Sequence, residues 1–103
     1  MSNEIISIVK RTKYSGVKVQ IPGGGVARRD VIVFQNNTEG VFDVYVALTG
    51  IYKDYYLKAA SSKEQHGDFL SDVVIKAVQV EKSGAIKTSE HLQQLLCEKK
   101  SID

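Results

Sequence analysis

The sequence predicts an α+β fold, with an antiparallel sheet of four to five strands in the N-terminal 60 residues and one or two C-terminal helices packed on one face. Three observations support this class: short β-branched runs separated by turn formers as far as residue 58, a change of pattern at Ala59, and a leucine stripe at helical spacing near the C-terminus. The chain has 103 residues, of which 43% are hydrophobic and 25% charged. We therefore expect a single domain, residues 1–103, around one core.

The first strands are predicted from alternation and from the turns that bound them. Val17, Val19 and Ile21 alternate with polar residues, as in a strand that turns one face to the core. Pro22 and the three glycines that follow it favour a turn. A phosphate-binding loop is disfavoured there, because no Gly-Lys-Ser/Thr follows. Strands are expected over 4–12, 15–21 and 29–35, and a hairpin over 41–58.

The hairpin is the most specific feature of the chain, because it sorts tyrosines onto one face. If the chain reverses at Thr49-Gly50, Tyr55 faces the core beside Val44. The opposite face then gathers three tyrosines, two carboxylates and a lysine: Tyr45, Tyr52, Tyr56, Asp43, Asp54 and Lys58. Such amphipathic rings are typical of a contact surface, although helices packed over this face would also account for them. A slip of one residue would exchange the two faces.

The C-terminal part is predicted to be helical. Residues 68–81 place their apolar side chains on about half of a helical wheel, with Asp68 as the cap, although a strand over 73–80 also fits the many valines. A last helix is expected to begin at Thr88 or Ser89 and to run to the final lysines. Its leucine stripe consists of Leu92, Leu95 and Leu96.

Composition excludes several classes of protein. No apolar run is long enough to cross a bilayer and no secretion signal opens the chain, so we expect a cytoplasmic protein without a membrane partner. The single cysteine, Cys97, cannot form an internal disulfide, which agrees with a reducing compartment. Glu64, His66 and Asp68 alternate in a polar stretch, but two histidines in the whole chain are too few for a dedicated zinc site. No metal, cofactor or catalytic set is predicted.

The preferred functional hypothesis is a small non-catalytic module, an adaptor or inhibitor, that binds a protein through its tyrosine-rich sheet face or an edge strand. The expected anchors are Tyr45, Tyr52, Tyr56 and Lys58. A nucleic-acid-binding regulator is the first alternative, although a net charge of +2 creates no strong overall field. Its basic patch would consist of Lys10, Arg11, Lys13, Arg28 and Arg29. A small-ligand carrier or enzyme is the weakest alternative, and a homo-oligomer is compatible with the sequence.

Overall fold

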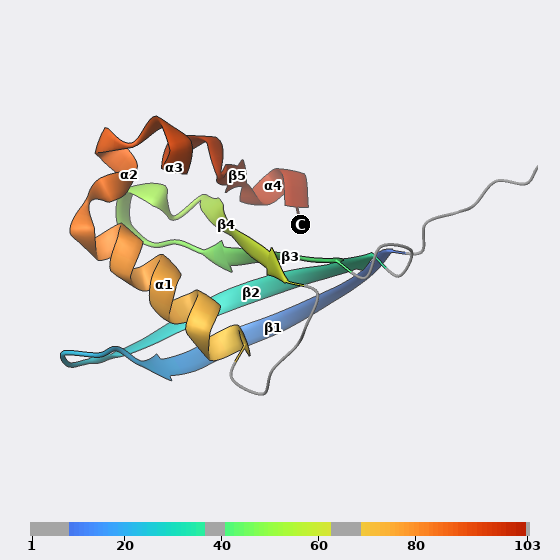
Figure 1. Ribbon diagram of the computed structural model, residues 1–103, viewed down its shortest axis with the longest axis horizontal. Coiled ribbons are helices and arrows are strands. Elements are labelled where there is room, and N and C mark those ends of the chain that lie inside the picture. The colour runs from blue at the N-terminus through green and yellow to red at the C-terminus, as the bar shows by residue number, and fades with distance from the viewer. Residues whose placement is uncertain (1–8, 37–40, 63–68, 103) are drawn as a thin grey trace, which may run out of the picture.

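The computed structural model describes residues 9–36, 41–62 and 69–102, and it confirms the α+β class (Figure 1). Five strands form one antiparallel meander in the order β1-β2-β3-β4-β5. The elements are β1 (Val9–Gln20), β2 (Val26–Asn36), β3 (Val41–Ala47), η1 (Gly50–Tyr52), β4 (Tyr55–Ser62), α1 (Phe69–Ser83), α2 (Ala85–Thr88), α3 (Glu90–Gln94), β5 (Leu96–Glu98) and α4 (Lys99–Ile102).

A bulge in β1 replaces the predicted break between the first two strands. The pairing of β1 with β2 slips by one residue between Tyr14 and Val17. Gly16 lies in the bulge with a φ of +62°, a conformation that favours glycine, and its backbone N–H donates a 2.8 Å hydrogen bond to Asp30 Oδ1. Over the described residues a single strand therefore replaces the two that were expected, and its side chains change faces at the bulge; positions 4–8 of the first expected strand lie outside the described residues.

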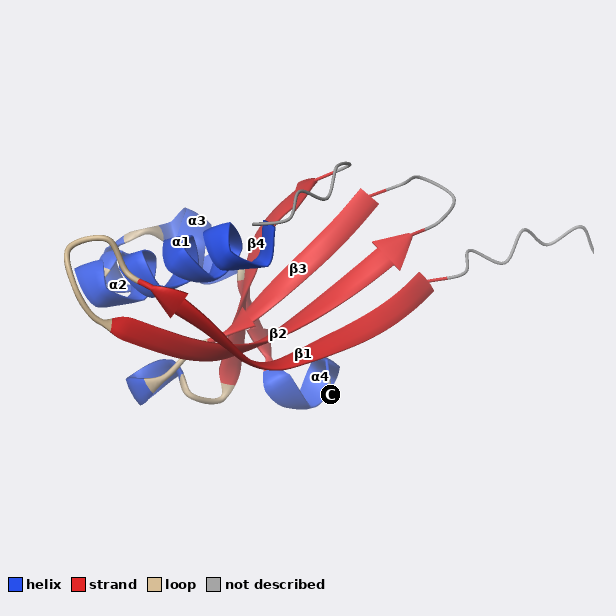
Figure 2. Ribbon diagram, turned by 90° about the horizontal axis from the view of Figure 1, so that it is seen from below, coloured by secondary structure: helices blue, strands red, loops and turns tan. Residues whose placement is uncertain are grey.

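The main core lies between α1 and one face of the sheet, which we call the α1 face. Helix α1 confirms that the segment predicted over 68–81 is a helix rather than a strand. Burial of its apolar side chains against the sheet outweighs the preference of valine for strands. Its buried side chains are Val73, Val74, Ala77 and Val78. They join a cluster that includes Val31, Val33, Val44, Val46 and Leu57 of the sheet. Figure 2 shows α1 on one side of the strands and α4 on the other.

The predicted register of the tyrosine hairpin is wrong. Val46 pairs with Leu57 rather than with Lys53, so the strands are displaced by four residues. A longer connection replaces the two-residue turn: η1 follows Thr49, and Leu48 N–H then bonds to the Tyr55 carbonyl oxygen at 3.1 Å. Because four is an even number, each strand residue keeps its predicted face.

The predicted last helix is also wrong in its length. Ser89 caps α3 as expected, with its hydroxyl accepting a 3.3 Å hydrogen bond from Leu92 N–H, but α3 ends at Gln94. The chain then forms β5, in which Leu96 pairs with Leu57. Pairing with the open edge of β4 satisfies backbone groups that a longer helix would leave exposed there.

Candidate functional site

The sheet face opposite α1, which we call the second face, carries most of the candidate residues. Directly paired residues on neighbouring strands point to the same side, so the register assigns side chains to this face. The pairs Arg11–Phe34 and Lys13–Ile32 place two cations of β1 on it. After the bulge, Lys18 pairs with Arg28 on the same face. The other described side chains on this face include Gln20, Val26, Asp30, Asp43, Tyr45, Ala47, Tyr56, Lys58 and Cys97.

A small apolar cluster anchors the middle of the second face. Ile32, Ala47 and Tyr56 are buried there, and Ile102 of α4 packs against them. Tyr56 is only 2% exposed, and the Lys99 ammonium group lies 5.6 Å from the centre of its ring. The expectation that Tyr56 is an exposed anchor for a partner is therefore wrong, because α4 and the neighbouring strands bury the ring.

Tyr45 remains partly accessible beside this cluster. Its ring packs edge-on against Phe34, with 5.6 Å between the ring centroids and 89° between the planes. Burial raises the pKa of the Tyr45 phenol, and the charges of Cys97 and Asp43 raise it further. Lys58 pairs with Tyr45 in the register, and its ammonium nitrogen lies 3.9 Å from Asp43 Oδ1. Half-buried Phe34 and Tyr45 thus form an aromatic pair at the surface of the second face.

The other tyrosines of the hairpin do not join this pair. Tyr52 lies in η1 and packs against the core of the α1 face. Tyr55, expected to be buried beside Val44, is half-buried and pairs with Glu98. Of the residues predicted to bind a partner, only Tyr45 and Lys58 are both on the second face and partly exposed.

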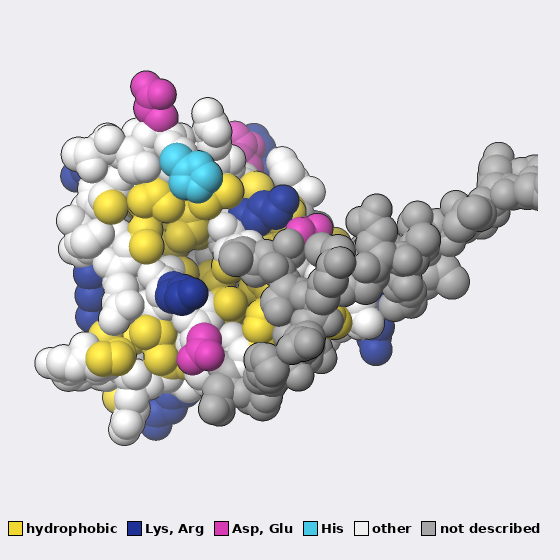
Figure 3. All heavy atoms as spheres, viewed as in Figure 1, with side chains coloured by type: hydrophobic (Ala, Val, Ile, Leu, Met, Phe, Trp, Pro, Cys, Tyr) yellow, Lys and Arg dark blue, Asp and Glu magenta, His cyan; other side chains and the backbone are white. Residues whose placement is uncertain are grey.

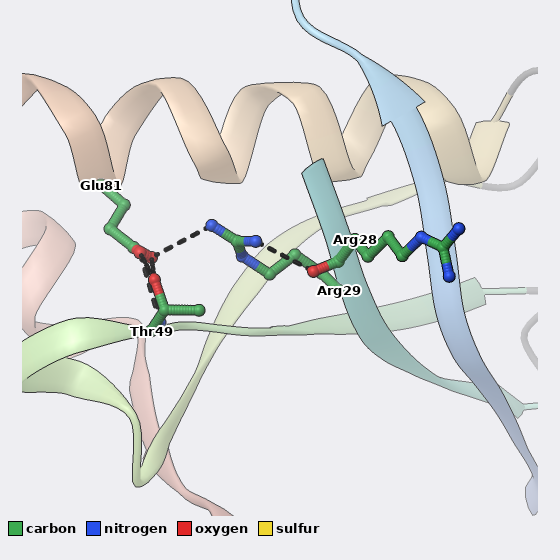
Figure 4. Close-up of polar contacts among 4 residues, drawn as sticks. All are labelled: Arg28, Arg29, Thr49 and Glu81. Atoms are coloured by element: carbon green, nitrogen blue, oxygen red, sulfur yellow. Dashed lines mark hydrogen bonds and ion pairs between the residues drawn. The ribbon is translucent and has the colours of Figure 1, made fainter. Parts of the chain in front are cut away.

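The predicted basic patch is assembled in part. Arg11, Lys13 and Arg28 share the second face, and all three are exposed. Lys10 pairs with Gln35 and so belongs to the other side. Figure 4 shows the two adjacent arginines diverging, with the Arg28 side chain running across β1 and that of Arg29 toward α1. Alternation along β2 therefore divides the predicted patch between the two faces.

Arg29 has a structural partner on the α1 side. Its Nη2 lies 3.9 Å from Glu81 Oε1, and its Nη1 donates a 2.9 Å hydrogen bond to the Arg28 carbonyl oxygen. Glu81 also accepts hydrogen bonds from the backbone N–H and the hydroxyl of Thr49, at 3.0 and 2.9 Å. This contact joins α1, β2 and the loop before η1 (Figure 4), so it stabilises the fold rather than offering a free cation.

Electrostatically, the second face differs from the molecule as a whole. Within the described residues it carries six cationic side chains against two carboxylates, a local charge of +4, whereas the whole chain carries +2. Sequence reasoning missed Lys18 and Lys99. The signal for Lys18 was the glycine at position 16, because a bulge there brings Lys18 and Arg28 to one face.

On the opposite side of the molecule, hydrophobic side chains gather between α1 and α3 (Figure 3). They line a hollow of about 170 Å³ above β4. This volume is smaller than the roughly 300–1,000 Å³ of most small-molecule sites, so the hollow does not favour a ligand carrier. Glu64, His66 and Asp68 lie outside the described residues, among which no group of three or more potential ligands could hold a metal ion.

No protein-family model, curated protein or solved structure matches the chain. Across the ranges that the structure describes, no helix has the length and apolar character needed to cross a membrane.

Proposed function

We propose that this protein binds nucleic acid on the second face of its sheet. The observation that carries the proposal is the concentration of positive charge on this face, where Arg11, Lys13, Lys18 and Arg28 form one row. Contacts to phosphate supply much of the affinity of nucleic-acid-binding proteins. On the second face the two hairpin strands carry one carboxylate and one ammonium group, Asp43 and Lys58, and the register adds these four cations to the same face.

The row has the dimensions of a track for a phosphate backbone. Phe34, opposite Arg11, is six residues from Arg28 on β2, which corresponds to about 20 Å along an extended strand. The four side chains are exposed and stand at the β1 edge of the sheet. Of the two carboxylates on this face, Asp43 lies 3.9 Å from the Lys58 ammonium nitrogen, which offsets its charge, whereas Asp30 keeps its charge and accepts a hydrogen bond from Gly16 N–H.

Salt dependence and charge reversal test the proposal together. Four phosphate contacts predict a slope of log K against log salt of about −3, so that affinity for a labelled oligonucleotide falls roughly 50-fold between 50 and 200 mM salt. Fluorescence anisotropy measures both quantities. The double variant Lys13→Glu/Arg28→Glu should lose most of the binding, because two phosphates would then face carboxylates.

A matched control carries the same change in charge on the other side of the molecule. The variant Lys76→Glu/Lys87→Glu alters exposed lysines of α1 and α2 and should bind as the wild type does. Equal losses in the two double variants would mean that only net charge matters. The proposal is refuted if the wild type does not bind the oligonucleotide at 50 mM salt, or if its affinity does not change with salt concentration.

A protein partner is the second candidate, and the edge position of β1 favours it. In the described sheet β1 pairs only with β2, so its outer backbone groups are open to strand addition. Cations along β1 discourage addition of a second copy and favour an acidic extended segment. Pull-down from the source cells with and without nuclease separates the two candidates. A protein that is captured despite nuclease treatment supports a protein partner, and a catch that nuclease removes supports nucleic acid.

A further inference from the structure

We infer that the nucleic acid is single-stranded and that its unpaired bases stack on Phe34 and Tyr45. This inference rests on the proposed function and specifies its ligand. The aromatic pair lies directly inside the cationic row: Phe34 is the pairing partner of Arg11, and Tyr45 lies on the next strand. Neighbouring strands are about 4.8 Å apart, so a backbone lying on β1 would place its bases over β2 and β3.

The aromatic pair is held as a fixed platform. Both rings are half-buried and pack against the cluster of Ile32, Ala47 and Tyr56 beneath the surface. Their edge-to-face contact at 5.6 Å fixes each ring against the other. A base that stacks on a ring already held in place orders few additional protein bonds, so little conformational entropy is lost on binding.

Stacking of this kind discriminates between single strands and duplexes. In a duplex the faces of the bases are occupied by neighbouring bases, so aromatic side chains on a sheet gain nothing from them. Unpaired bases leave their faces available, and stacking on aromatic side chains is tolerant of sequence because every base has such a face. The cations would attract both forms, whereas Phe34 and Tyr45 would bind only the single strand.

The probes are a 12-nucleotide oligothymidylate and a 12-base-pair duplex, each labelled for fluorescence anisotropy. We expect the wild type to bind the single strand at least tenfold more tightly than the duplex. Phe34→Leu and Tyr45→Leu should each weaken single-strand binding by roughly 5- to 150-fold, the range for removal of one stacking contact, and leave duplex binding unchanged. Tyr45→Phe keeps the ring and should therefore retain more of the single-strand affinity than Tyr45→Leu does.

A second measurement does not depend on the folding of the leucine variants. The chain has five tyrosines and no tryptophan, so its intrinsic fluorescence comes from tyrosine. Oligothymidylate should quench part of this fluorescence, and the quenched part should disappear in Tyr45→Phe when the variant is saturated with oligothymidylate. Quenching of equal amplitude in the two proteins would overturn the assignment of Tyr45 as a stacking residue.

The outcomes separate this inference from the proposed function. If single strand and duplex bind equally well, with the same salt dependence and with no effect of the leucine substitutions, the site binds phosphate alone and the inference is overturned while the proposed function stands. If neither probe binds at 50 mM salt, both the inference and the proposed function are refuted. Polyglutamate serves as the control polyanion, and its binding should be insensitive to Phe34→Leu and Tyr45→Leu.

Discussion

Replacing Tyr56 by alanine tests the burial of the second face. The side chain is 2% exposed and lies among Ile32, Ala47 and Ile102, beneath the ammonium group of Lys99. A buried aromatic side chain removes roughly 150–250 Å² from water, and truncating one to alanine costs about 3–5 kcal/mol. Loss of the cation–π contact adds about 0.5–1 kcal/mol. A total of about 4 kcal/mol is a large part of the stability expected for a domain of this size.

Urea unfolding followed by far-UV circular dichroism measures this cost. With a slope of about 2 kcal/mol per molar urea, the midpoint of Tyr56→Ala should fall by roughly 2 M. The neighbouring Tyr55 is the matched control, because it is the same residue type on the same strand but only half-buried. Tyr55→Ala should cost no more than about half as much. If Tyr55→Ala costs the larger amount, or if Tyr56→Ala stays within about 1 kcal/mol of the wild type, the reasoning about this face is refuted.

Two further predictions concern polar groups. Glu81→Ala should destabilise the protein by about 2–3 kcal/mol in urea unfolding, because Thr49 N–H and the largely buried Arg29 both lose their acceptor. The control is Glu98→Ala, which removes an exposed ion pair and should cost less than about 0.5 kcal/mol. Equal costs in the two variants would contradict this prediction. The pKa of Tyr45 is raised above 10.0 in the folded state, so as pH rises through 10 the unfolded chain ionises first and folding stability is lost. Unfolding midpoints at pH 9 and 11 should therefore differ less in Tyr45→Phe than in the wild type, and an equal difference would show that burial of this phenol is not involved.

The faces of the hairpin could be predicted from the sequence, whereas its register could not. Alternation with a period of two assigns each residue to a face, and a displacement by an even number of residues preserves that assignment. The longer connection at Thr49 is stabilised by hydrogen bonds to Glu81, which lies 32 residues away in the sequence. A pattern confined to residues 41–58 contains no information about that contact.

The last strand had no local signal. Leu96-Cys97-Glu98 follows the leucine spacing of a helix, and these three residues become a strand because β4 offers an unpaired edge. That pairing brings Cys97 beside Tyr56 and starts α4 beneath the second face. The burial of Tyr56 therefore depends on a contact between segments about 40 residues apart. Alternation along the sequence predicts which face the Tyr56 ring lies on, but it does not predict that the ring is buried.

The candidate site likewise depends on one backbone feature. Arg11 and Lys13 lie on the second face before the bulge, and strict alternation would place Lys18 on the α1 face and Val19 on the second face. The extra residue at Gly16 reverses this order, so that Val19 enters the core while Lys18 joins Arg28. Both the apolar packing of β1 and the continuity of the cationic row follow from that reversal.

Under the proposed function, one face of the sheet serves stability and the other serves binding. Substitutions beneath α1 should lower stability and leave the affinity of the folded protein unchanged, whereas Lys13, Arg28 and Tyr45 lie at a surface where substitution affects the ligand first. Tyr56 is the exception, because it supports the aromatic pair from below and is itself buried. A conservative Tyr56→Phe variant that folds but binds the single strand more weakly would indicate that the apolar cluster positions Phe34 and Tyr45 for stacking.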